Sequence, residues 1–159
     1  MTELDAHIAS RARGIDARLA AAPGATMAWL GENGAGKSTV LECLAGIVTQ
    51  DSGHVLLGSR QLQRGGAGLH ARQRQVALLT QDDTLFETMS VTDNIAYGLR
   101  SRRVPRERAR AAARAWLVDV GLPELGDARP GQLSGGQRRR VAIARARASR
   151  PSLVLLDEP

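Results

Sequence analysis

The sequence predicts an α/β fold in which a mostly parallel sheet carries a glycine-rich loop. Two short, continuous apolar runs, residues 76–80 and 153–156, are typical of strands buried on both faces of a parallel sheet. A third apolar run, residues 26–30, leads into the glycine-rich segment, and a helical pattern at residues 38–45 follows it until Gly46. We therefore expect a strand, a loop and a helix, in this order, at the centre of the fold.

Composition places the chain among ordinary globular proteins. Its 159 residues suffice for one domain with a sizeable core, and 43% hydrophobic with 24% charged residues is a usual balance. No apolar run approaches the roughly 18 to 20 residues that span a bilayer, so we expect a cytoplasmic protein. The single cysteine, Cys43, excludes an internal disulfide and a multi-cysteine metal site, and its apolar neighbours predict a buried position.

We divide the chain into residues 1–81, 82–150 and 151–159. The first segment opens with alternating apolar residues at 4–8 and again at 15–19, which predicts a two-stranded antiparallel piece. A further strand is expected at residues 54–57 and a flexible loop at residues 64–68.

The second segment is predicted to be mostly helical. Its clearest helix covers residues 106–120, with Pro105 at its start and Gly121 at its end. The apolar stripe of this helix consists of Ala109, Ala113, Trp116, Leu117 and Val120. The formal charge of +6 comes with arginines spread over residues 100–150 and almost no aromatic residues among them, so we interpret most of them as solvated helix faces.

The chain's only lysine, Lys37, lies in the glycine-rich segment of residues 31–38. This segment satisfies the pattern G-x-x-x-x-G-K-[ST] and stands between the expected strand and helix. Glycines allow successive backbone N–H groups to surround an anion, and the helix N-terminus adds partial positive charge. We predict a nucleotide site in which Lys37 bridges the β- and γ-phosphates and Ser38 ligates Mg²⁺. The residues predicted to contact the nucleotide here are Asn33, Gly34, Ala35, Gly36, Lys37, Ser38 and Thr39.

The apolar run 153–156 ends in two acids, Asp157 and Glu158. A strand ending here would place Asp157 at the carboxyl edge of the sheet beside the phosphate loop, where Mg²⁺ would be held. The carboxylate of Glu158 would face the γ-phosphate region and orient or deprotonate the attacking water. A strand that simply ends in a solvated acidic turn is the alternative, and the phosphate loop favours the catalytic interpretation.

Residues 133–137, Leu-Ser-Gly-Gly-Gln, precede an arginine-rich helical pattern at residues 138–149. Ser134 is a good N-cap, and Gly135 and Gly136 leave backbone N–H groups approachable. This helix terminus therefore suits an anion, although the segment read in isolation is a capped surface helix.

These three motifs, in this order, resemble the nucleotide-binding domain of ATP-binding cassette (ABC) proteins. Residues 31–39 match the Walker A motif, residues 133–137 match the signature sequence and residues 153–158 match Walker B. The resemblance implies a P-loop NTPase core with an N-terminal antiparallel β piece and an α-helical subdomain. It also implies an ATPase that uses ATP and Mg²⁺.

In this family, the signature of one subunit closes over ATP held by the Walker A motif of another. The resemblance therefore implies a head-to-tail homodimer in which the signature acts on the partner's γ-phosphate. The signature residues concerned are Ser134, Gly135, Gly136 and Gln137. The catalytic residues would be Glu158, Gln81 and Lys37, and the ligands of Mg²⁺ would be Ser38, Gln81 and Asp157.

Gln81 follows the expected strand 76–80, where the family has its Q-loop glutamine, and a surface amide at a strand end is the alternative. Residues 82–99 resemble the helical-subdomain entry of importers for molybdate, sulfate, polyamines and thiamine. This patch receives the coupling helix of the membrane subunit. Leu85, Phe86 and Met89 are therefore candidate contacts with that helix, or equally core residues of the subdomain.

The resemblance thus implies the ATP-hydrolysing subunit of an importer, bound to a transmembrane permease at the inner face of the cell membrane. An ABC ATPase that acts on nucleic acid is an alternative, which the charge of +6 suits. The interval 81–134 lacks the long heptad arms and zinc cysteines of DNA-repair relatives, so we expect no direct contact with nucleic acid.

Two features depart from the family's pattern. No aromatic residue precedes Trp29, so His7 or Ile8 would have to cover the adenine base. The sequence stops at Pro159, before the family's D-loop and switch histidine, and its histidines all precede the signature. We therefore expect a core that is incomplete at its C-terminus, and a nucleotide-binding fragment without turnover is a third alternative.

Overall fold

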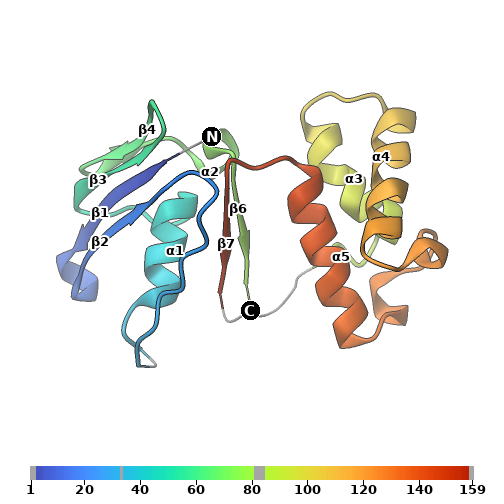
Figure 1. Cartoon of the computed structure of the whole chain (residues 1–159), viewed down its shortest axis with the longest axis horizontal. Coiled ribbons are helices and arrows are strands. Elements are labelled where there is room, and N and C mark those ends of the chain that lie inside the picture. Colours follow the sequence, from blue (N-terminus) through green and yellow to red (C-terminus); the bar gives the residue numbers. More distant parts are fainter. Residues whose placement is uncertain (1–2, 33, 81–84, 158–159) are drawn as a thin grey trace. The chain divides into compact units, whose positions relative to one another are not determined.

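The structure is a computed structural model that describes residues 3–32, 34–80 and 85–157. The chain folds into two compact units (Figure 1). The first comprises Met1–Leu78 together with Ser152–Asp157, and the second comprises Leu79–Pro151. Among the described residues, no helix combines the length and the apolar character needed to cross a membrane.

An antiparallel sheet forms the larger part of the first unit. Its five strands are β1 (Leu4–Ser10), β2 (Ile15–Ala21), β3 (Ser52–Leu57), β4 (Arg60–Arg64) and β5 (Ala67–Gly68), in the order β2-β1-β3-β4-β5. A short 3-10 turn, Arg11–Arg13, and Gly14 connect β1 to β2. The predicted antiparallel piece and the predicted strand at 54–57 are confirmed, and they belong to one sheet.

The prediction of a flexible loop at residues 64–68 is wrong. Arg64 pairs with Ala67 and Gln63 pairs with Gly68, so this segment closes a hairpin between β4 and β5. Gly65 has a φ of 55° and its N–H donates to the Gly53 carbonyl at 2.8 Å. Glycine here supplies the left-handed backbone of a tight turn and not flexibility.

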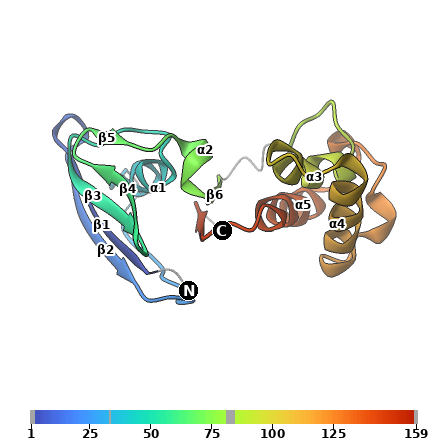
Figure 2. The same cartoon turned by 90° about the horizontal axis from the view of Figure 1, so that it is seen from above.

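Helix α1 (Lys37–Ala45) packs against one face of this sheet, as Figure 2 shows. Alternate residues of β1 point to this face and are buried with Val40, Cys43 and Leu44 of the helix. Burial raises the pKa of the Cys43 thiol, and the charges of Arg13 and Arg74 oppose that shift. Cys43 is therefore the buried residue that its apolar neighbours predict.

Strands β6 (Val76–Leu79) and β7 (Leu153–Leu156) form a separate two-stranded sheet, and helix α2 (Ala71–Arg74) precedes β6. Both predicted strands are confirmed, and Figure 1 shows them running in the same direction. The expectation that both faces would be buried is wrong for β7. Leu155 is buried, whereas Val154 and Leu156 on the other face are 43% and 44% exposed, because the core that includes Leu155 covers only one side of this strand.

The predicted strand at residues 26–30 is also wrong. The segment has no regular structure, and its large apolar residues are exposed, with Leu30 at 87%. A strand requires ladder hydrogen bonds to a neighbour, and residues 26–30 pair with no strand of either described sheet. Apolar character alone cannot supply those bonds.

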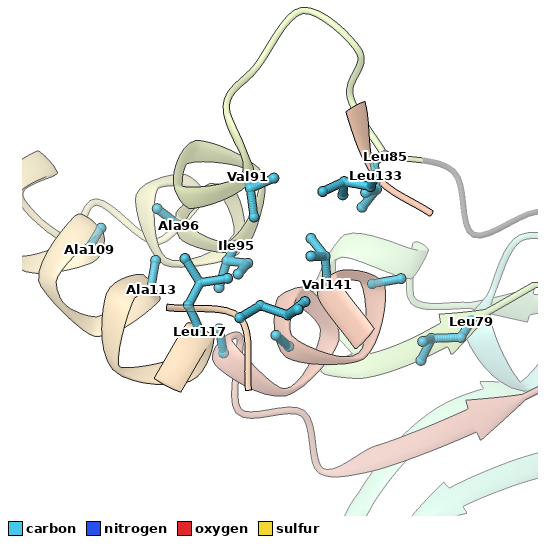
Figure 3. Close-up of a cluster of buried hydrophobic side chains, with 14 residues drawn as sticks. Leu79, Leu85, Val91, Ile95, Ala96, Ala109, Ala113, Leu117, Leu133 and Val141 are labelled. Carbon is cyan, nitrogen blue, oxygen red and sulfur yellow. The ribbon is translucent and has the colours of Figure 1, made fainter. Parts of the chain in front are cut away.

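The second unit is helical, with α3 (Val91–Ser101), α4 (Arg106–Asp119) and α5 (Gly135–Ala148) and two short 3-10 turns, Pro123–Leu125 and Pro130–Gln132. The apolar stripe of the predicted helix 106–120 lies in its core: Ala109, Ala113 and Leu117 are fully buried, and Trp116 and Val120 pack against them. Figure 3 shows Ala109, Ala113 and Leu117 in one cluster with Val91, Ile95 and Val141.

Replacing Leu117 by alanine should destabilise the helical unit by about 2 to 5 kcal/mol, because the side chain is fully buried and its removal leaves a cavity. Urea unfolding followed by circular dichroism measures the loss. Val118→Ala is the matched control, since Val118 is 63% exposed on the same helix and its truncation should cost well under about 1 kcal/mol. Equal effects of the two substitutions would contradict the packing described above.

Candidate functional site

The glycine-rich loop enters α1 through left-handed backbone at Gly34 and Gly36, both with a φ of 82°. Other residues adopt this conformation only at a cost, which explains the two glycines. The Lys37 ammonium donates to the carbonyls of Gly31 at 2.8 Å and Glu32 at 2.7 Å. The charged group therefore lies across the loop that precedes it.

The N-terminus of α1 opens directly out of this loop. The Val40 N–H donates to the Gly36 carbonyl at 3.0 Å, and helix geometry leaves the N–H groups of residues 37–39 without an intrahelical acceptor. These donors and the helix dipole concentrate partial positive charge beside the Lys37 ammonium. The predicted residues Gly34, Ala35, Gly36, Lys37, Ser38 and Thr39 thus lie together where the loop enters α1, an arrangement that suits an anion.

Sequence reasoning missed Ile15, the first residue of β2. Its side chain lies against the loop, and a Cβ built on Gly36 would be 3.0 Å from it. The sequence carries no signal for this contact beyond an apolar residue after the turn at Gly14. The two residues expected to cover a base are not placed for it: Ile8 is completely buried, and His7 lies on the sheet face opposite α1, bonded to Asp16 at 2.8 Å.

Asp157 directly follows β7 and is partly buried. It belongs to the same compact unit as Lys37 and Ser38, and Leu155 of β7 packs in the core that contains α1. Three predicted site residues, Asn33, Gln81 and Glu158, lie outside the described residues.

The signature segment begins helix α5 in the second unit. Ser134 is its N-cap, as predicted, and forms a capping box with Gln137. The Gln137 N–H donates to Ser134 Oγ at 3.3 Å, and the Ser134 N–H donates to Gln137 Oε1 at 2.9 Å. Gly135 and Gly136 are exposed, with no atom within 4 Å of a Cβ built on either. The first turn of α5 is therefore open to a ligand.

An exposed aromatic pair, Phe86 and Tyr97, marks the surface of the helical unit. The rings are 4.6 Å apart at their centroids and are 39% and 46% exposed, and the Arg145 guanidinium lies 5.3 Å from the Phe86 ring. Asn94 holds the chain here, since its side chain accepts from the Phe86 N–H and donates to the Phe86 carbonyl. Leu85, in contrast, is a core residue at 6% exposed.

Fold and site together define a member of the ABC transporter family. A family model described as "ABC transporter" matches residues 16–159, so the chain belongs to this family. The matched range contains the glycine-rich loop, the signature segment and the strand that ends at Asp157.

Within this family, the chain is similar to the ATP-binding proteins of importers. The chain is 44% identical, over its whole length, to the molybdenum import ATP-binding protein ModC of Mycobacterium tuberculosis (strain CDC 1551 / Oshkosh). It is 42% identical to the Fe(3+) ions import ATP-binding protein FbpC 1 of Rhizobium meliloti and 43% identical to the sulfate/thiosulfate import ATP-binding protein CysA of Synechococcus elongatus, over 91% of the chain in both. The chain spans less than half the length of these relatives, at 45%, 40% and 41%.

Replacing Ser134 by alanine should destabilise the helical unit by roughly 1 kcal/mol, because it removes the side-chain half of the capping box on α5. Ser134→Thr, which keeps an N-cap hydroxyl, is the control and should retain most of the stability. Urea unfolding measures both variants. An alanine variant that unfolds at the wild-type urea concentration would show that the cap contributes nothing.

Proposed function

We propose that this chain is the ATP-binding and ATP-hydrolysing part of an importer. The observation that carries the proposal is the glycine-rich loop, where left-handed backbone at Gly34 and Gly36 brings the Lys37 ammonium and the N-terminus of α1 to one place. Phosphate groups are the anions that such a helix terminus binds. The names of the relatives, all import ATP-binding proteins, support ATP as the phosphate compound.

In this proposal, the backbone N–H groups of the loop surround the β- and γ-phosphates and Lys37 neutralises charge between them. Mg²⁺ fits the donor set, because the Ser38 hydroxyl and the Asp157 carboxylate both offer oxygen, which this ion prefers. Both residues belong to the first unit. Gln81 would be a further ligand of Mg²⁺. The bound ion would neutralise part of the negative charge of the phosphates. Glu158 would orient the attacking water and accept its proton.

We also propose that two copies of the domain form a head-to-tail dimer. The exposed first turn of α5, with Gly135 and Gly136 beside the capping box of Ser134 and Gln137, offers N–H groups to an anion held by another chain. The γ-phosphate of ATP on the partner is that anion. ATP binding would then close the dimer, and hydrolysis would reopen it.

The permease contact is proposed at the exposed aromatic pair of the helical unit. Phe86 and Tyr97 give an apolar surface, to which Met89 adds a partly buried side chain. A coupling helix of the permease would dock there, which holds the chain at the inner face of the membrane. Relatives of nearly equal identity import molybdenum, Fe(3+) ions or sulfate, so the proposal names no particular solute.

Lys37→Ala should weaken MgATP binding at least about tenfold, because a charge-assisted hydrogen bond of about 1.5 to 3 kcal/mol is lost. Isothermal titration calorimetry gives the dissociation constant, and phosphate release gives the hydrolysis rate. Arg64→Ala, at an exposed position of β4, is the control and should bind as the wild type does. Wild-type chain that binds no MgATP, or a Lys37→Ala variant that binds it equally well, would refute the proposed function.

The dimer should form with MgATP when hydrolysis is blocked by Glu158→Gln, and size-exclusion chromatography with light scattering would detect it. Adding Gly135→Glu to that variant should abolish the dimer but leave ATP binding by each monomer unchanged, because a carboxylate on α5 would repel the partner's γ-phosphate. A dimer that persists with glutamate at this position would contradict the head-to-tail arrangement.

A further inference from the structure

The first unit buries one arginine completely in protein. Arg74, the last residue of α2, is 2% exposed, and among the ion pairs of the described residues none includes it. Burial lowers the pKa of its guanidinium from the ordinary value. A buried charge without a carboxylate is costly unless hydrogen bonds satisfy it. Its acceptors therefore show what the charge stabilises.

Two of those acceptors belong to the last turn of α1. Arg74 Nη1 donates to the carbonyls of Cys43 at 2.7 Å and Leu44 at 3.2 Å. These carbonyls lie at the C-terminus of the helix, where the partial charge is negative, and the Cys43 carbonyl also accepts from the N–H of the C-cap Gly46 at 3.1 Å. Arg74 thus caps the end of α1 opposite to the glycine-rich loop.

The other contacts of the guanidinium fix its position. Nε donates to the Leu69 carbonyl at 2.8 Å, and Nη2 donates to the buried Gln63 side chain of β4. Gly46 and Gly68 leave the required space, since a Cβ on Gly46 would overlap the guanidinium and one on Gly68 would overlap the Gln63 amide. The absence of side chains at Gly46 and Gly68 therefore leaves room for the Arg74 guanidinium and its Gln63 acceptor.

The next residue along the chain joins Arg74 to β6 and β7. Gln75 has a φ of 59°, uncommon for a residue other than glycine, and leads directly into β6. Its carbonyl accepts from the Ser152 N–H at 2.8 Å, immediately before β7. Residues 73–75 form the junction between α2 and β6, and Arg60 contacts it. Arg60 donates to the Gln73 carbonyl at 2.7 Å and to the Gln75 side chain at 3.1 Å. One junction thus contacts α1, β6 and β7.

We propose that Arg74 is a positioning residue of the nucleotide site, which fixes α1 relative to β7 so that Ser38 and Asp157 can serve one nucleotide-bound Mg²⁺. This inference rests on the proposed function. Helix α1 has nine residues and is about 13 Å long, so a shift at its C-terminus is transmitted to the loop at its other end. Arg74 contacts no nucleotide in this proposal and acts only through the helix.

The test compares Arg74→Met with Arg72→Met in the full chain. Arg72 is exposed on the same helix two residues away, so its variant should behave as the wild type. Calorimetric titrations with MgATP, and with ATP in excess EDTA, measure binding well below the melting temperature of each variant. Arg74→Met should bind MgATP about tenfold more weakly, because small misplacements of binding groups are costly. The advantage of MgATP over ATP alone should shrink as well.

The ratio of the dissociation constants for ATP in EDTA and for MgATP distinguishes a positioning role of Arg74 from a general effect on stability. Loss of stability alone lowers the melting temperature and leaves that ratio unchanged, so a folded Arg74→Met variant with the wild-type ratio and affinity overturns the inference. If Arg74→Met does not fold, Gln63→Met decides instead; it removes one acceptor of Arg74 together with the hydrogen bond from the Gln63 amide to the Gly65 carbonyl. Weaker MgATP binding by this variant supports the inference and unchanged binding overturns it. A wild type that binds no MgATP would refute the proposed function and this inference with it, whereas a wild type that binds MgATP beside an unchanged Arg74→Met variant overturns the inference alone.

Discussion

The left-handed backbone at Gly36 is the constraint on which the first unit depends. It turns the chain from an exposed loop into α1, so that the helix can bury Val40 and Leu44 against the sheet while its N-terminus stays open. A Cβ at this position would lie 3.0 Å from the Ile15 side chain, closer than ordinary van der Waals contact. The left-handed conformation of Gly36, which glycine adopts without strain, allows α1 to be buried while its N-terminus stays exposed.

A buried arginine fixes the other end of the same helix. The Cys43 carbonyl at the C-terminus of α1 already accepts from the Gly46 N–H at 3.1 Å. Arg74 adds a second donor to it and a donor to the Leu44 carbonyl. The Arg74 guanidinium is buried without a paired carboxylate. Its hydrogen bonds go instead to two carbonyls of α1, to the Leu69 carbonyl and to the Gln63 side-chain amide. Both ends of α1 are thus determined by polar contacts, and its middle by apolar packing.

How much of this the sequence predicts depends on how local the cause is. The N-cap at Ser134, the helix around Ala113 and the strands β6 and β7 follow from short patterns, and the structure has them. The predicted strand at residues 26–30 fails because a strand needs a partner, and the predicted loop at residues 64–68 fails because its glycines form a turn. No pattern distinguishes Arg74 from the exposed Arg72 beside it.

The sequence by itself determined the class of protein, because the glycine-rich loop, the signature and the acidic strand end are contiguous motifs within the range that the family model matches. The roles of the residues in these motifs stay predictions. Only the tertiary structure decided which of two neighbouring arginines is buried, that Leu85 is core while Phe86 is exposed, and that Ile15 faces the loop. These outcomes depend on contacts between residues far apart in the chain. Local propensity does not specify which distant residues will meet.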